Sequence, residues 1–331
     1  MIHKTEWMNF LASSDWLPDK TESLAGDAST RKYIRIYKND KSAIFMDSST
    51  EMEKISAFIK ISLHLQKLGL SAPKIYNTDL KNGFLLLEDF GNNSIYSLAK
   101  NNLQSSQLHF VYEKILDTLH VIQAAPIPSS TPVYTNKRLI KDATEFFSYW
   151  YPQIASSVNH SVAQAEFSQA LKPAMSEAWK LPAVLSLRDF HAGNLMWLAN
   201  RDCIEKIGLL DFQDAISAPS TYDIMSLLCD ARLQLSKALT KKIINQHLKA
   251  NPHIDPLTFS VSYAALGAQR AFRIIGVFTR LALICDKPHY QKYIPHVWEH
   301  VYEHVSHPKL YDLRQWLLEF VPSSRVALVE Q

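Results

Sequence analysis

Short alternating runs of hydrophobic and polar positions in the first 90 residues predict strands, with helices at residues 4–13 and 51–68. Three strand-like runs lie between these helices, at residues 23–28, 30–38 and 42–47. Two more follow at residues 73–80 and 83–90, with Asn82-Gly83 as a hairpin turn. The pattern predicts a compact α+β lobe of five strands.

Apolar positions from residue 94 onward recur mainly at helical spacing. Helices are predicted near residues 105–124, 139–151, 161–179, 222–248 and 256–284. Between them lies a polar island, residues 183–221, in which short apolar strands flank irregular loops. Because loops on a rigid scaffold often carry chemistry, this island is the first place to look for a site.

Composition excludes several classes of protein. Apolar residues make up 47% of the 331 positions, which is enough for a sizeable core. The net charge of +3, without a long basic run, argues against a nucleic-acid partner. The three cysteines are widely spaced and indicate neither a disulfide framework nor a metal site. With no signal-peptide pattern and no apolar segment long enough to span a bilayer, we expect a cytoplasmic protein without a membrane partner.

The polar island contains a spacing that is typical of phosphoryl transfer. It reads LRDFHAGNLMWL and then IGLLDFQDA, which places Asp189 five residues before Asn194 and puts Asp211 after the next apolar strand. Asp189 is suited to accept a hydroxyl proton, while Asn194 and Asp211 offer the oxygen ligands that Mg²⁺ prefers. The alternative is that the two aspartates merely cap turns between strands.

The segment Asp189–Asn194 resembles the catalytic loop of the aminoglycoside phosphotransferase superfamily, which has a protein-kinase-like fold. Leu187 departs from the histidine that usually stands there. Within the superfamily the chain is similar to bacterial cell-wall kinases for N-acetylmuramic acid and N-acetylglucosamine, which act on the anomeric hydroxyl. The segments that carry this similarity are residues 24–36, 43–49, 83–91, 209–232 and 269–281.

The resemblance implies a two-lobe α+β fold, with a nucleotide-binding lobe at residues 1–90 and a larger, mainly helical lobe at residues 91–331. It also implies ATP and Mg²⁺ as cofactors and an amino sugar as substrate. The kinase-like fold would use the backbone around Glu88 and Phe90 to meet adenine, and Gly26 and Ser29 stand at the position of a glycine loop.

The third strand lacks the lysine that normally meets the phosphates. Arg31 is the candidate that we select to supply the positive charge, with Lys32 and Arg35 as alternatives, and a solvated strand edge is the competing interpretation. The missing lysine also supports a second function class, a nucleotide-binding pseudokinase that regulates a partner.

Polar residues next to the island are candidates for substrate binding. Arg270 and Arg273 share one helix face, and either would suit the lactyl carboxylate of N-acetylmuramic acid. The remaining candidates are Arg188, Asp214, Tyr222 and Asp223. The competing interpretation is that Asp223 caps a helix and that the arginines form surface ion pairs. A kinase for an aminoglycoside, choline or homoserine is the alternative enzyme.

Overall fold

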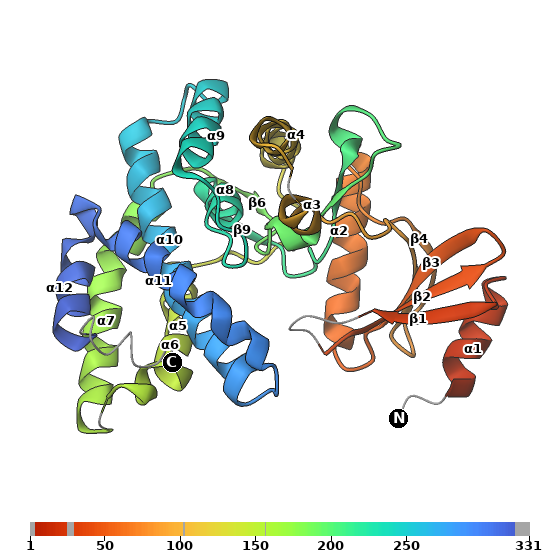
Figure 1. The fold of residues 1–331 in the computed structure, drawn as a ribbon, viewed down its shortest axis with the longest axis horizontal. Coiled ribbons are helices and arrows are strands. Elements are labelled where there is room, and N and C mark those ends of the chain that lie inside the picture. The colour runs from red at the N-terminus through yellow and green to blue at the C-terminus, as the bar shows by residue number, and fades with distance from the viewer. Residues whose placement is uncertain (1–3, 25–29, 102, 156, 322–331) are drawn as a thin grey trace. The chain divides into compact units, whose positions relative to one another are not determined.

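The computed structural model describes residues 4–24, 30–101, 103–155 and 157–321 (Figure 1). The chain divides into two compact units. The first unit contains the described residues up to Thr118 and the segment Ala192–Ala215. The second unit contains Leu119–His191 and the described residues from Ile216 onward.

A five-stranded antiparallel sheet forms the centre of the first unit, in the order β1-β2-β3-β5-β4 (Figure 1). Helix α1 packs aromatic side chains on this sheet, where Phe10 lies against Phe45 and Phe84. The strands are β1 (Lys20–Leu24), β2 (Lys32–Lys38), β3 (Lys41–Asp47), β4 (Ile75–Asp79) and β5 (Phe84–Glu88). The helices beside them are α1 (Lys4–Ser13), the 3₁₀ turn Met52–Lys54 and α2 (Ile55–Lys67).

The turn between β4 and β5 requires a glycine. Gly83 has φ +79°, and a Cβ atom there would lie 2.9 Å from backbone atoms of Ser49. Positive φ and close backbone approach both favour glycine, as the predicted Asn82-Gly83 turn requires.

The remaining elements of the first unit carry part of the polar island. Strands β7 and β8 pair as a small antiparallel sheet, and Ser71 makes an isolated bridge to Gly208 on β8. These elements are α3 (Ile95–Lys100), β7 (Leu195–Trp197), β8 (Ile207–Leu209) and the 3₁₀ turns Ala192–Asn194 and Cys203–Lys206. The boundary between the units falls within α4 (Ser105–Ala124).

Helix α10 organises the second unit, where it packs against α5, α6, α7, α8 and α11 (Figure 1). Phe146, Phe272 and Trp316 belong to its aromatic core. The α-helices are α5 (Asn136–Ala143), α6 (Glu145–Tyr149), α7 (Ser157–Ala178), α8 (Thr221–Leu228), α9 (Lys237–Ala250), α10 (Pro256–Leu283), α11 (Ile294–Val305) and α12 (Tyr311–Phe320). A two-stranded sheet joins β6 (Ala183–Ser186) and β9 (Ile216–Pro219), and 3₁₀ turns lie at Tyr151–Gln153, Pro288–Tyr293 and Pro308–Leu310.

The predicted α+β class is confirmed, with a five-stranded antiparallel sheet followed by a mainly helical remainder. The single helix predicted over residues 222–248 is wrong. It is interrupted after Leu228 because Asp230 turns the chain by accepting from the Arg232 N–H, and Ser236 caps the start of α9. The sequence pattern also missed α3, α11 and α12. The first strand begins at Lys20 rather than at residue 23, and residues 25–28 of the predicted strand lie outside the described residues.

Among the helices of the described ranges, none has both the length and the apolar character needed to cross a lipid bilayer.

Candidate active site

Asp211 presents its carboxylate from a strained turn just after β8 in the first unit. Its φ of +57° is uncommon for a residue with a side chain, and such strain is often found at functional sites. Arg31 Nη2 donates to Asp211 Oδ1 at 2.9 Å and Gln213 Nε2 donates to the same oxygen at 3.0 Å. Asn194 Nδ2 lies 3.5 Å from Asp211 Oδ2. The fold therefore brings together two residues that the sequence predicted as metal ligands.

Arg31 is the predicted cation that lies at this site. Its side chain is 4% exposed and also faces Glu51, with Nε 3.4 Å from Oε2. Arg35, the alternative cation, is instead committed to Asp89, with Nε 2.7 Å from Oδ2. Burial raises the pKa of Tyr33, beside Arg31, to about 12, so its phenol stays neutral. One buried positive charge therefore stands next to the Asp211 carboxylate.

A second cation, which the sequence analysis missed, lies in the same unit. Lys54 Nζ is 3.4 Å from Glu51 Oε2 and 3.5 Å from Asp214 Oδ2. Helix α2, which begins just after Lys54, also supports the turn through Phe58, whose ring stacks on Phe212 at 5.0 Å between centroids. No periodic pattern singles out Lys54, because its partner Asp214 is 160 positions away in the chain.

Of the four other residues predicted to contact the nucleotide, the structure describes Glu88 and Phe90. Glu88 is the last residue of β5, and its side chain pairs with Arg201. Its N–H donates to the Lys74 C=O at 2.8 Å. Phe90 is partly exposed, and its ring lies 5.2 Å from the Arg201 guanidinium. Gly26 and Ser29 lie outside the described residues.

In the second unit, Asp189 follows a tight turn centred on Arg188. Arg188 has φ +69°, and the Asp189 N–H donates to the Leu187 C=O at 2.8 Å, the i to i+2 bond of a classic γ-turn. Asp223 holds this turn, because its carboxylate accepts from the N–H groups of Leu187 at 2.7 Å and Arg188 at 3.1 Å. The turn is strained, and Asp223 stabilises it.

Three arginines surround Asp189. Arg270 Nη2 lies 3.7 Å from Asp189 Oδ1, and its Nη1 donates to the Arg188 C=O at 3.3 Å. Burial alone would raise the pKa of Asp189, but the charges of Arg270, Arg273 and Arg188 outweigh burial and lower the pKa. Asp189 is therefore ionised at neutral pH. Arg270 is 6% exposed, so the surface ion pair considered from sequence does not describe it.

Arg188 is itself held by a residue that the sequence analysis missed. Its Nη2 lies 3.1 Å from Asp142 Oδ2, and its guanidinium lies 5.3 Å from the centre of the Tyr134 ring. The Tyr134 hydroxyl donates to the same Asp142 oxygen at 2.7 Å. Asp142 lies on α5, 46 positions before Arg188, and an aspartate in a polar helix gives no sequence signal.

Burial raises the pKa of Asp223 to about 6, although hydrogen bonds from Ser186 and the backbone of Leu187 and Arg188 oppose the rise. Tyr222, its neighbour on α8, is fully buried, and its hydroxyl lies 3.4 Å from Arg270 Nη1. The second unit thus gathers Arg188, Asp189, Tyr222, Asp223 and Arg270 in one group linked by hydrogen bonds and an ion pair.

The phosphotransferase enzyme family matches residues 20–256, which include both turns and all the hydrogen-bonded groups around them except Arg270. The chain belongs to this family. The family resemblance predicted from the catalytic-loop spacing is therefore confirmed, and the chain is a kinase-type enzyme of the phosphotransferase class.

Two relatives share most of their length with this member of the phosphotransferase family. A protein named N-acetylmuramate/N-acetylglucosamine kinase from Caulobacter vibrioides is 32% identical over 348 aligned positions, covering 95% of this chain and 95% of the relative. A protein of the same name from Pseudomonas aeruginosa is 28% identical, covering 88% of this chain and 86% of the relative.

Solved structures show the same fold at much lower sequence identity. The ADP-bound structure of an aminoglycoside phosphotransferase superposes with a TM-score of 0.63 at 13% identity. The match covers 91% of this chain and 99% of that one. The kinase-like two-lobe fold class predicted from the sequence is confirmed.

Proposed function

We propose that this chain is an ATP-dependent kinase for the anomeric hydroxyl of N-acetylmuramic acid and N-acetylglucosamine, acting in cell-wall recycling. The observation that carries the proposal is the relative of that name, which is 32% identical across 95% of the chain. An anomeric hydroxyl is more acidic than an ordinary sugar alcohol, so a carboxylate base needs less driving force to accept its proton. The resulting sugar 1-phosphate is a ready precursor for nucleotide-sugar synthesis.

Asp189 is the proposed catalytic base. A base must be ionised before the reaction, and the arginines around Asp189 lower its pKa. The γ-turn at Arg188 fixes where the carboxylate points, and Asp223 acts as a positioning residue because it bonds the backbone of that turn. In this proposal Asp189 accepts the hydroxyl proton while the oxygen attacks the terminal phosphate of ATP.

Asn194 and Asp211 would hold Mg²⁺, and their donor set fits that ion. An amide and a carboxylate lie side by side, and the Asp211 side chain is 39% exposed. Oxygen ligands with open positions suit Mg²⁺, which keeps several waters. When bound, the ion would neutralise charge on the phosphates. We further propose that Arg31 supplies the phosphate contact of the missing lysine, and that Gly26, Ser29 and the backbone at Glu88 and Phe90 contact the nucleotide.

The positive charge around Asp189 bears on the choice of substrate. Arg188, Arg270 and Arg273 disfavour a cationic antibiotic or choline, and favour a neutral or anionic sugar. Because Arg270 is occupied with Asp189 and Tyr222, we assign the lactyl carboxylate to Arg273 first. Tyr222 and Arg188 would shape the pocket from behind, and Asp214 remains a proposed substrate contact that now faces Lys54.

The two regions of the chain have different roles in the proposed reaction. We propose that residues 1–90 serve the nucleotide and that residues 91–331 carry the base, the metal ligands and the sugar site. Use of ATP and three free cysteines favour the cytoplasm as the place of reaction. The pseudokinase alternative is disfavoured because Asp189, Asn194 and Asp211 are all present.

The test is a phosphate-transfer assay with purified protein, Mg-ATP and a panel of amino sugars, read by phosphorus NMR. We expect a sugar 1-phosphate from both N-acetylated sugars. Blocking C1 as the methyl glycoside should abolish the product, whereas blocking C6 should not.

Phosphorylation of the methyl glycoside at an undiminished rate would refute the anomeric assignment but leave a kinase. Absence of transfer to any sugar, with transfer to an aminoglycoside or choline, would support the alternative enzyme. Nucleotide binding without transfer to any compound of the panel would favour the pseudokinase.

A further inference from the structure

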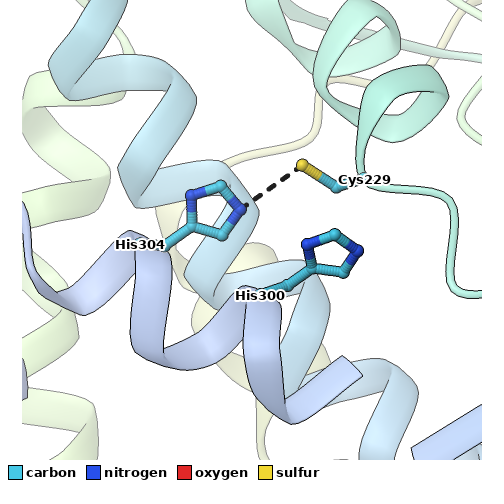
Figure 2. Close-up of side chains that lie close together, drawn as sticks. All are labelled: Cys229, His300 and His304. Carbon is cyan, nitrogen blue, oxygen red and sulfur yellow. Dashed lines mark hydrogen bonds between the residues drawn. The ribbon is translucent and has the colours of Figure 1, made fainter. Parts of the chain in front are cut away.

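A cluster of one thiol and two imidazoles lies in the second unit, apart from the groups assigned to phosphoryl transfer. Within the described residues, Cys229, His300 and His304 are the one group of three such side chains whose ligand atoms all lie within 4.8 Å of one another. Figure 2 shows the two histidine rings on one face of α11 and Cys229 opposite them at the end of α8.

The spacing of these groups follows from the fold. Residues four apart on a helix share a face, so His300 and His304 point the same way from α11. Cys229 is the residue at which α8 ends, which brings its Sγ to 3.4 Å from His304 Nε2. His304 fits there because Gly267 on α10 has no side chain, and a Cβ atom at that position would collide with the imidazole ring.

The separations are close to those of a tetrahedral metal site. Bond lengths of about 2.3 Å to sulfur and about 2.0–2.1 Å to nitrogen place tetrahedral ligand atoms about 3.4–3.6 Å apart. The Cys229–His304 pair already has that separation. Because all the ligand atoms lie within 4.8 Å of one another, each remaining separation has to shorten by at most about 1.4 Å.

His300 has a ring nitrogen that is buried and makes no hydrogen bond. This buried nitrogen is Nε2, and the backbone of Asp230 lies close enough to the ring to act on the pKa of the imidazole. A metal-binding imidazole is commonly oriented by a hydrogen bond from its other ring nitrogen to a carboxylate, a backbone carbonyl or water, and Asp230 is placed to act as such a partner. His300 and Cys229 also line a cavity of about 10 Å³, room for roughly one water as a fourth ligand.

Charged groups of both signs lie around the cluster. The charges of Glu303 and Asp230 act to raise the pKa of the Cys229 thiol, while the charge of Arg270, which lines the same cavity, acts to lower it. Burial lowers the pKa of His300 to about 4 and of His304 to about 3, so both rings are neutral and can donate a lone pair.

We propose that Cys229, His300 and His304 form a binding site for a borderline-soft divalent cation, Zn²⁺ in the first place, with water as the fourth ligand. One sulfur and two nitrogen donors select this class over Mg²⁺ or Ca²⁺, which require oxygen. Burial raises the pKa of the Cys229 thiol to about 12, so binding displaces the thiol proton, which leaves to solvent. The bound ion joins the end of α8 to α11.

The experiment uses the full chain with the exposed cysteines replaced, Cys203→Ser and Cys285→Ser, so that Cys229 is the one remaining thiol. The protein is stripped with a chelator and titrated with Co²⁺ as a spectroscopic probe. We expect a thiolate-to-cobalt charge-transfer band and tetrahedral d–d bands that saturate at one equivalent. Calorimetry with Zn²⁺ should give one site per chain with a dissociation constant below about 1 µM.

Cys229→Ser in this background should abolish the charge-transfer band, and His300→Gln should weaken Zn²⁺ binding by about 10- to 100-fold. His289→Gln, at an exposed histidine of the same unit, is the matched control and should leave both readouts unchanged. Circular dichroism checks that each variant is folded.

Two results would overturn the site. One is a cobalt spectrum without a thiolate band in the folded background protein, which decides the question even if both ligand variants unfold. The other is Zn²⁺ affinity that is equal in the background, in Cys229→Ser and in His300→Gln. In either case the cluster is a packed polar group in which the Tyr263 hydroxyl and His304 surround the thiol.

Discussion

Two carboxylates at one γ-turn, those of Asp189 and Asp223, have opposite pKa shifts. Asp189 and Asp223 both lose solvent, and desolvation alone would raise the pKa of each. For Asp189 the charges of three arginines outweigh burial and the pKa falls, whereas for Asp223 burial outweighs its hydrogen bonds and the charge of Arg270, and the pKa rises to about 6. Neighbouring charge, rather than burial, therefore decides which carboxylate is available as a base.

Asp189→Asn tests the proposed catalytic base. The change keeps the shape of the side chain but removes its ability to accept a proton, so kcat should fall by about 10²- to 10⁴-fold. Nucleotide affinity, measured by calorimetry, should stay within a factor of about two because the base acts on the hydroxyl. A variant with near-full turnover would show that another group is the base.

Arg270→Met tests the cause of the Asp189 pKa shift. The ionised base is present above its pKa, so activity falls as pH drops through that value. Removing the Arg270 charge raises the pKa, and the acid limb of kcat/KM should move to higher pH. Arg270→Lys keeps the charge and should leave the limb near its original position. If the acid limb of kcat/KM does not move in Arg270→Met, the charge of Arg270 is not the cause of the lowered Asp189 pKa.

Asp211→Asn tests the proposed metal ligand. Calorimetry with ADP should show Mg²⁺-dependent affinity reduced by more than about 10-fold, because the main anionic ligand is lost. Asp214→Asn, which removes a carboxylate three positions later that faces Lys54, serves as the control and should retain that dependence. Equal Mg²⁺ dependence in Asp211→Asn and the unmodified protein would contradict the assignment.

At the scale of elements, the second unit depends on how closely helices approach α10. Gly276 lies where α10 meets α6, and a Cβ atom there would collide with the backbone of Glu145 and Phe146. Backbone atoms cannot rotate away as a side chain does, so the two helices would have to separate. Their contact therefore requires glycine despite its low helix propensity.

Gly276→Ala should therefore lower the free energy of unfolding by about 1–3 kcal/mol, even though alanine is the better helix former. Denaturant titration followed by circular dichroism measures the change. Leu283→Ala, at an exposed position of the same helix, should stay within about 0.5 kcal/mol of the unmodified protein. Stabilisation by Gly276→Ala would mean that the two helices are not in close contact.

At the scale of the whole molecule, buried histidines make stability depend on pH. His247 is fully buried, and its Nδ1 lies 3.1 Å from Nε2 of His120. Burial, with the nearby His120 and His253, lowers the pKa of His247 to about 4. An unfolded chain takes up this proton near pH 6.5 and the folded chain does so only near pH 4, so stability is lost as pH falls through that window.

We expect this residue to make the protein less stable by about 2 kcal/mol at pH 5 than at pH 7.5. In His247→Gln that part of the pH dependence should disappear, while His289→Gln at an exposed site should keep it. Chemical unfolding at the two pH values gives the comparison. An identical pH dependence in His247→Gln and the unmodified protein would contradict the assignment.

Periodicity and spacing along the chain determined the class of fold and the chemistry of the catalytic loop. Five strand-like runs and the helix spanning 51–68 predicted the first sheet and α2, because alternation and helical spacing arise from local geometry. The Asp189-to-Asn194 spacing predicted the chemistry, and the resemblance of residues 189–194 to a known catalytic loop indicated the family, because these residues belong to one continuous loop.

The tertiary structure determined the features that depend on contacts between residues far apart in the chain. Lys54 and Asp142 acquire their roles from partners 160 and 46 positions away, and no local pattern encodes such pairs. The break after Leu228 places Cys229 beside His304, 75 positions later, although the sequence favoured one continuous helix there. Local periodicity reports which face of an element is buried, whereas the neighbours it meets depend on how the whole chain packs.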